Sequence, residues 1–186
     1  MRLERLLGYS THEHAGEVPL SIWRQRGIRA LILDKDNTLS DFHGTTTLPY
    51  VIQGLKEQGI ALFPNIAVVS NGEDSKAVSE FGKRLEGELG VSVLAVCVGD
   101  GFRRKPNPDM GNAVAACLGV TPDEIGVIGD RRLVDVTFGH RLGAGAIALC
   151  NKQGESDAFG VPIVRVIEGS IVRHETVRAE RELIAA

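Results

Sequence analysis

The chain has 186 residues, of which 43% are hydrophobic and 24% charged, and these proportions exclude an intrinsically disordered or collagen-like protein. The net charge of −3 argues against nucleic-acid binding, because neutralising phosphates needs a basic surface. No run reaches the ~18 apolar residues of a membrane-spanning helix, and the first residues lack the apolar run of a signal peptide. We therefore expect one domain over residues 1–186, in the cytoplasm or the mitochondrial matrix.

The first 29 residues contain five arginines and Trp23, the chain's single tryptophan. A basic, partly apolar segment of this kind can lie on an anionic membrane surface. Alternatively, its apolar side chains pack against the rest of the protein, namely Leu6, Leu7, Leu20, Ile22 and Trp23. The sequence leaves both interpretations open, and the first predicts peripheral contact with a membrane.

From residue 27 onward, short apolar runs alternate with helix-like segments. The runs cover residues 28–33, 66–69, 91–98, 125–128 and 144–149. Continuous apolar runs of this length, separated by helices, are typical of strands buried on both faces of a parallel sheet. The pattern therefore predicts an α/β fold with an open, doubly wound parallel sheet.

The ends of two intervening helices can be recognised. Asp74 is a suitable N-cap for a helix that reaches about residue 88 and stops at Gly90, and Pro108 suits the first turn of a helix that stops at Gly119. Residues 171–186 mix acidic, basic and apolar side chains and predict a surface helix, to which the sequence assigns no function.

Polar side chains follow the carboxyl ends of four predicted strands, where open α/β sheets build their sites. They are Asp34 and Asp36, then Ser70 and Asn71, then Lys105, and finally Asp130 and Asp135. Each group alone has an ordinary explanation, as a solvated turn or calcium loop, a tight turn, a surface lysine or a helix cap. Because the four strand ends meet at one edge, we expect the groups to converge.

In their order and strand positions these groups resemble the four motifs of the haloacid dehalogenase superfamily, over residues 28–150. Asp36, at the second acidic position, resembles the phosphatase branch. A closer resemblance, to the phosphatidylglycerophosphate phosphatases of mitochondria and bacteria, lies in the segments Asp34-Lys35-Asp36-Asn37-Thr38-Leu39, Gly129-Asp130-Arg131 and Gly139-His140-Arg141-Leu142-Gly143. The resemblance implies a Rossmann-like core and a magnesium-dependent phosphatase.

The resemblance also implies roles for the motif residues. Asp34 would attack phosphorus to form an aspartyl-phosphate, and Asp36 would protonate the leaving group and then activate water. Ser70 and Lys105 would hold the phosphoryl oxygens, with Asn71 close to the phosphate.

Magnesium would be the cofactor that this resemblance implies. It would be bound by the carboxylates of Asp34 and Asp130 and by the backbone carbonyl of Asp36. Asp135 would orient water or Lys105 beside the ion.

The motif spacing bears on the substrate. Asp34 and Ser70 are 36 positions apart and Ser70 and Lys105 are 35 apart; a helix and a strand fill each interval, so no cap domain fits. An open site accepts a phosphate carried by a large body such as a lipid surface. The resemblance implies phosphatidylglycerophosphate, cleaved to phosphatidylglycerol on the route to cardiolipin. A soluble phosphomonoester, a nucleic-acid end and a noncatalytic phosphate-binding module remain as alternatives.

Four arginines flank the predicted site, and they suggest two explanations. They could attract a substrate with two phosphates, or they could balance the nearby carboxylates. They are Arg103, Arg104, Arg131 and Arg132.

Overall fold

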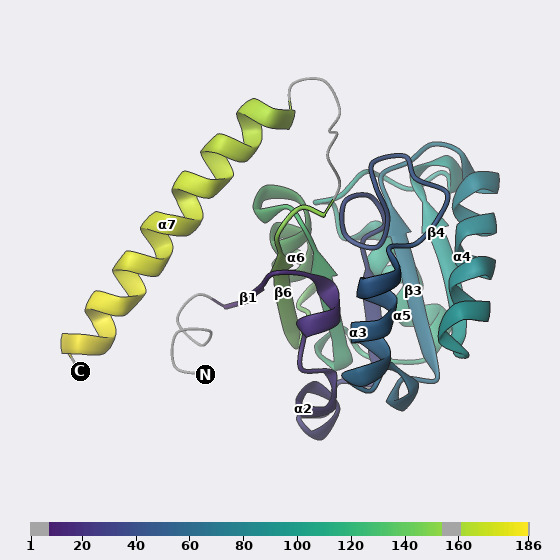
Figure 1. Cartoon of the computed structure of the whole chain (residues 1–186), viewed down its shortest axis with the longest axis horizontal. Coiled ribbons are helices and arrows are strands. Elements are labelled where there is room, and N and C mark those ends of the chain that lie inside the picture. Colours follow the sequence, from purple (N-terminus) through teal and green to yellow (C-terminus); the bar gives the residue numbers. More distant parts are fainter. Residues whose placement is uncertain (1–7, 154–160, 186) are drawn as a thin grey trace.

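A parallel sheet forms the centre of the computed structural model, which describes residues 8–153 and 161–185 (Figure 1). Its six strands lie in the order β1-β6-β5-β2-β3-β4, and every pair of neighbours is parallel. The strands are β1 (Ser10–His12), β2 (Ala30–Leu33), β3 (Asn65–Ser70), β4 (Ser92–Cys97), β5 (Ile125–Gly129) and β6 (Ala146–Cys150). The predicted α/β fold and the five predicted strands are confirmed.

Helices cover both faces of the sheet (Figure 1). The α-helices are α2 (Leu20–Gln25), α3 (Pro49–Glu57), α4 (Ser75–Leu89), α5 (Asp109–Leu118), α6 (Thr137–Leu142) and α7 (Val161–Ala185). Short 3-10 turns cover Ala15–Glu17, Ile60–Leu62, Val98–Asp100 and Pro122–Glu124, and a π-helical turn, η5, covers Arg132–Val136.

The two faces of β2 show how the core is divided. Leu31 and Leu33 pack with buried side chains of α2, α3 and α4 on one face, whereas Ala30 and Ile32 pack with α5 and α6 on the other. Successive side chains of a strand point to opposite faces. A strand apolar at every position is therefore buried on both sides, as the continuous apolar runs predict.

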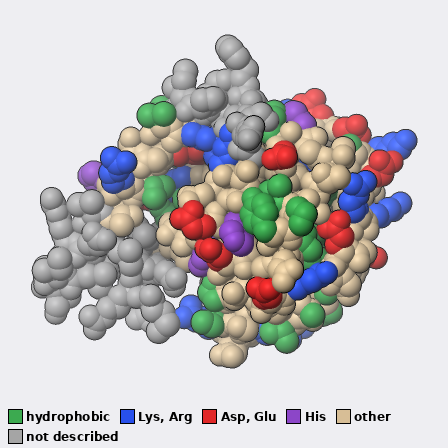
Figure 2. Space-filling model, viewed as in Figure 1, with side chains coloured by type: hydrophobic (Ala, Val, Ile, Leu, Met, Phe, Trp, Pro, Cys, Tyr) green, Lys and Arg blue, Asp and Glu red, His purple; other side chains and the backbone are tan. Residues whose placement is uncertain are grey.

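The predicted helix ends are confirmed except at Pro108, which is the N-cap residue before α5 and does not lie in the first turn of the helix. The Asp74 carboxylate accepts a hydrogen bond from the backbone N–H of Ala77 at 3.0 Å, which caps α4. Gly90 and Gly119 follow α4 and α5 with φ angles of 69° and 64°, a left-handed conformation that glycine adopts without strain. The outer side of α4 carries acidic and basic side chains interspersed, at the right-hand edge of Figure 2, as expected of a solvated helix face.

Of the five N-terminal side chains named in the packing interpretation, two pack in the core. Leu20 and Trp23 of α2 are buried, whereas Ile22 is 43% exposed. Gly126 of β5 makes room for the indole, because a Cβ at this position would lie 2.5 Å from the Trp23 ring. The packing interpretation therefore holds for Leu20 and Trp23, while Leu6 and Leu7 lie outside the described residues. Among the helices of the described ranges, none is long and apolar enough to cross a membrane.

The strand order determines where the site lies. From β2 the chain continues to β3 and β4 on one side, and then returns to β5 on the other side. Sites in open α/β sheets form at such a reversal, beyond the carboxyl ends of the strands. Between residues 34 and 70, the described elements are α3, a 3-10 turn and β3, as the spacing argument predicts.

Candidate active site

A sharp turn after β2 positions the first two acidic side chains. The backbone N–H groups of Leu39 and Ser40 donate to the carbonyl oxygen of Lys35 at 3.0 and 3.1 Å. Within this turn the Asp36 carboxylate accepts from the Lys35 ammonium at 2.8 Å and from the backbone N–H of His43 at 2.9 Å. Asp36 is thus held in an oriented position on the wall of the cavity, beside Asp34.

Lys105 is buried between two carboxylates. Its ammonium lies 2.5 Å from Asp34 Oδ1 and 2.7 Å from Asp135 Oδ1, and its side chain is 2% exposed. Asn71 fixes the backbone at this position, because its Oδ1 accepts from the Lys105 N–H at 2.7 Å and its Nδ2 donates to the Lys105 carbonyl at 3.3 Å. Thr38, which sequence reasoning assigned no separate role, donates its hydroxyl to Asp34 Oδ2 at 3.2 Å.

Ser70 is held at the end of β3. Its hydroxyl accepts a hydrogen bond from the backbone N–H of Gly72 at 3.0 Å, and the residue is 1% exposed. The neighbouring Asn71 lines the cavity, and Ser70 is not among its lining residues. A hydrogen bond of this kind is what the tight-turn interpretation of Ser70 predicts.

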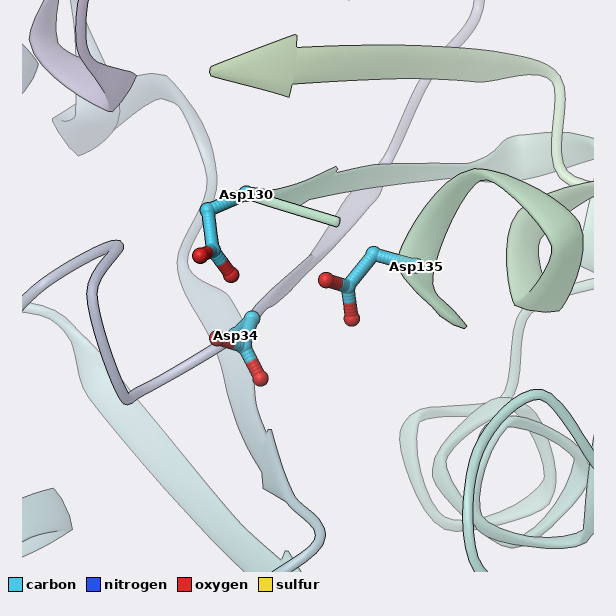
Figure 3. A group of neighbouring side chains, drawn as sticks. All are labelled: Asp34, Asp130 and Asp135. Atoms are coloured by element: carbon cyan, nitrogen blue, oxygen red, sulfur yellow. The ribbon is translucent and has the colours of Figure 1, made fainter. Parts of the chain in front are cut away.

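Three carboxyl groups face one another at the sheet edge (Figure 3). One oxygen from each of Asp34, Asp130 and Asp135 lies within 4.8 Å of the others. Gly129 permits this approach, because a Cβ there would overlap the Asp135 carboxyl group. Asp135 Oδ2 accepts from the Arg131 N–H at 3.1 Å. Asp130 does not cap the following helix; its carboxylate pairs with Arg165.

Burial and mutual repulsion dominate the electrostatics of these groups. Burial, followed by repulsion from Asp135, raises the pKa of Asp130 above the usual value of an aspartate. Burial also raises the pKa of Asp34. The Lys105 ammonium acts in the opposite direction, because it favours the charged carboxylate, but burial outweighs it. For Lys105, burial lowers the pKa, but attraction to Asp135 and Asp34 outweighs it, so the pKa is raised and the lysine stays charged.

The donor set fits a magnesium ion. Converging carboxylate oxygens are the ligands that this hard cation prefers. Three closely spaced carboxylates also repel one another, so a divalent cation would relieve their repulsion. Asp34 and Asp130 therefore suit the ligand roles expected of them, and Asp135, held by Lys105 and by the Arg131 N–H, suits the orienting role.

The cavity next to the carboxylates has a volume of about 460 Å³. Of the four arginines predicted to flank the site, Arg104 and Arg131 line it, and so does Arg165 of α7. Arg103 instead pairs with Asp109, and Arg132 pairs with Glu175. Arg104 and Arg131 also pair with carboxylates, those of Glu73 and Glu168, so charge balancing applies to all four and two of them line the cavity as well. Sequence reasoning missed Arg165, which lies 30 positions beyond Asp135 and belongs to no motif.

A family model described as "Mitochondrial PGP phosphatase" matches residues 8–153, which contain β1 to β6 and every predicted site residue. The chain belongs to this family. Membership in this family confirms the resemblance drawn from the motifs.

Two curated proteins are similar to the chain. A phosphatidylglycerophosphate phosphatase 1 of Arabidopsis thaliana, described as chloroplastic/mitochondrial, is 26% identical over 160 residues. The match covers 82% of this chain but 43% of the plant protein, so the chain spans less than half of that relative. A probable phosphatase of Bacillus subtilis, YqeG, is 27% identical over 152 residues, covering 80% of this chain and 79% of that protein.

Solved structures support the fold. A Corynebacterium glutamicum protein of uncharacterised function matches with a TM-score of 0.52 and 16% identity, over 76% of this chain and 93% of that one. A Listeria monocytogenes protein, also uncharacterised, matches with a TM-score of 0.51 and 17% identity, over 72% and 88% of the two chains. At these identities the likeness concerns the fold alone.

Proposed function

We propose that this member of the family is a magnesium-dependent phosphomonoesterase that hydrolyses phosphatidylglycerophosphate to phosphatidylglycerol and inorganic phosphate. The observation that carries the proposal is the Asp34 carboxylate beside the buried Lys105, with the carboxyl oxygens of Asp130 and Asp135 within 4.8 Å. A carboxylate held next to a cation and a divalent-ion site is the arrangement that nucleophilic attack on an anionic phosphate needs.

In the first half-reaction, an Asp34 oxygen forms a bond to phosphorus as the bond to the leaving alkoxide breaks. Asp36 donates a proton to that alkoxide, which leaves as an alcohol. Lys105 and Asn71 flank the transferred phosphoryl group. Lys105 offsets part of the negative charge that its oxygens carry in the transition state.

In the second half-reaction, the aspartyl-phosphate on Asp34 is hydrolysed. Asp36, ionised by its earlier donation, takes a proton from water as the water oxygen bonds to phosphorus and the bond to Asp34 breaks. The Lys35 ammonium and the His43 N–H keep the Asp36 carboxylate oriented for both proton transfers. Magnesium, held by Asp34, Asp130 and the Asp36 carbonyl, would supply charge neutralisation at the phosphoryl oxygens.

The family name and the plant relative support a phosphorylated lipid as substrate. The short connections between Asp34 and Ser70 leave the cavity beside Asp34 without an inserted cap. On this proposal residues 1–186 form one phosphatase domain, which acts peripherally on a membrane in the mitochondrial matrix or the bacterial cytoplasm. Its product would feed phospholipid and cardiolipin synthesis.

The test is phosphate release from phosphatidylglycerophosphate in mixed micelles with magnesium, beside p-nitrophenyl phosphate. Asp34→Asn should lower kcat by about a thousandfold or more, because it removes the nucleophile. The exposed Asp41, in the same segment but outside the cavity lining, provides the matched control Asp41→Asn, which should keep wild-type turnover. Turnover of the small ester alone would contradict the lipid substrate. Turnover of neither would favour a noncatalytic phosphate-binding module.

A further inference from the structure

The C-terminal helix α7 lies outside the residues that the family model matches, yet it is attached to the site. Glu175 accepts from the Arg132 guanidinium at 2.6 and 3.1 Å and from the Tyr9 hydroxyl at 2.8 Å. Glu168, 5% exposed, accepts from the backbone N–H of Leu133 at 2.9 Å. Two acidic side chains of α7 therefore bind η5, the turn that carries Asp135.

The same side of α7 directs Arg165 into the cavity. Arg165 lies three residues before Glu168, and residues at this spacing share a helix face. Its guanidinium donates to the Asp130 carboxylate and, at 3.4 Å, to the Asp130 backbone carbonyl. Arg165 also lines the cavity that contains Asp34 and Lys105.

Arg165 differs from the other cations of the cavity in what it could bind. Lys105 is buried between Asp34 and Asp135, and Arg104 pairs with Glu73 at the exposed rim. Arg131 lies beside Glu168 of α7, with Nε 3.9 Å from the carboxylate. The carboxylate that Arg165 engages is one of the three that suit a divalent cation, so a bound cation and the guanidinium would compete for Asp130. A guanidinium is a planar fork of donors that matches a phosphate group bidentately.

We propose that Arg165 is a substrate-binding residue that exchanges Asp130 for the second anionic group of a substrate carrying a phosphomonoester and a further phosphate. Through this contact α7 sets the preference for two-phosphate substrates over simple phosphomonoesters. The inference rests on the proposed function, since a phosphatidylglycerophosphate headgroup carries a phosphomonoester and a phosphodiester.

The test measures binding rather than turnover. Full-length Asp34→Asn protein with magnesium is titrated calorimetrically with deacylated phosphatidylglycerophosphate, which has both phosphates and no acyl chains, and with glycerol phosphate. Adding Arg165→Gln should reduce the preference for the two-phosphate probe by about tenfold or more, because a charge-assisted contact is lost. Arg165→Lys should reduce it less, because the charge remains without the fork. Arg173→Gln, on the exposed side of α7, is the matched control and should keep the preference.

A second readout follows because Arg165 and a bound cation would compete for the Asp130 carboxylate. In protein with Asp34 intact, Arg165→Gln should strengthen magnesium binding, measured as the metal concentration that half-saturates the rise in Tm. The inference is overturned if Arg165→Gln weakens both probes equally or neither, if the two-phosphate probe shows no preference, or if the variant weakens magnesium binding. Loss of preference in the variant, in a protein whose wild type releases no phosphate, would support this inference while the proposed function fails.

Discussion

The Lys105 ammonium and the Asp135 carboxylate are 2.7 Å apart, and their side chains are 2% and 3% exposed. The same ammonium contacts Asp34, whose side chain is 12% exposed, so one buried cation serves two carboxylates. Breaking a buried pair by removing one partner costs more than the pair contributes, because the remaining charge is left without compensation. Lys105 therefore holds Asp34 and the turn η5, which carries Asp135, together in the absence of substrate.

The first prediction concerns this cation. Lys105→Met should lower the free energy of unfolding of the metal-free protein by about 3–5 kcal/mol at neutral pH, because Asp34 and Asp135 then face each other without it. Urea denaturation would measure the loss. Lys76→Met on α4, whose side chain is 87% exposed, is the control and should change stability by less than about 0.5 kcal/mol. Equal stability of the two variants would contradict the role given to Lys105.

The second prediction concerns pH. Burial raises the pKa of Asp130 from 3.8 to about 6, so in the folded state this carboxyl group binds its proton more tightly than in the unfolded chain. The resulting stability is fully present below pH 3.8 and is lost as the pH rises through about 6. Metal-free wild-type protein should therefore lose more Tm than Asp130→Asn between about pH 4 and about pH 7, by a few degrees.

Melting curves in the presence of a chelator would measure this difference. Adding magnesium at neutral pH should raise the wild-type Tm, because the ion takes the place of the proton between the carboxylates. Parallel pH profiles for wild type and Asp130→Asn would mean that Asp130 titrates normally.

The central strands could be predicted from sequence because both faces of each are buried, so their apolar runs are continuous. Strand β1 could not, since it is three residues long, carries Ser10, Thr11 and His12, and pairs with β6 at the sheet edge. The convergence of Asp34, Lys105 and Asp135 followed from parallel strands ending at one edge. The direction of the Ser70 hydroxyl did not, because it depends on a local hydrogen bond with Gly72.

The C-terminal helix shows the limit of local patterns. A helix was expected from residue 171, and α7 begins at Val161. Its attachment depends on ion pairs between Glu175 and Arg132, and between Arg165 and Asp130, which lie 43 and 35 positions apart. Charged residues on a surface helix give no local signal of distant partners, so Arg165 could be found only from the structure.

The third prediction concerns the contact between Gly129 and Asp135. Gly129→Ala should displace the Asp135 carboxyl group, because the added methyl group would occupy its place. We expect a loss of stability of about 1–3 kcal/mol from overpacking and weaker magnesium binding, measured by denaturation and by metal-dependent Tm.

Gly87→Ala is the matched control. The added methyl group there meets nothing within 4 Å on α4, so helix stability should rise by up to about 1 kcal/mol. Unchanged magnesium binding in Gly129→Ala would show that the metal site does not require the Asp135 carboxyl group to lie this close to Gly129.

The fourth prediction separates core packing from membrane docking at the N-terminal segment. Trp23 packs over Gly126 and is 5% exposed, so Trp23→Ala should lower stability by about 3–5 kcal/mol. Ile22→Ala removes the neighbouring exposed side chain and should leave the Tm within a degree or two, since little apolar surface is uncovered.

Because Trp23 is the single tryptophan, its fluorescence reports on this position alone. In wild-type protein the emission should be that of a buried indole and should stay constant when anionic vesicles are added, whether or not the protein sediments with them. A shift in emission on vesicle binding would mean that the indole leaves its place over Gly126, and would restore the membrane-docking interpretation for Trp23.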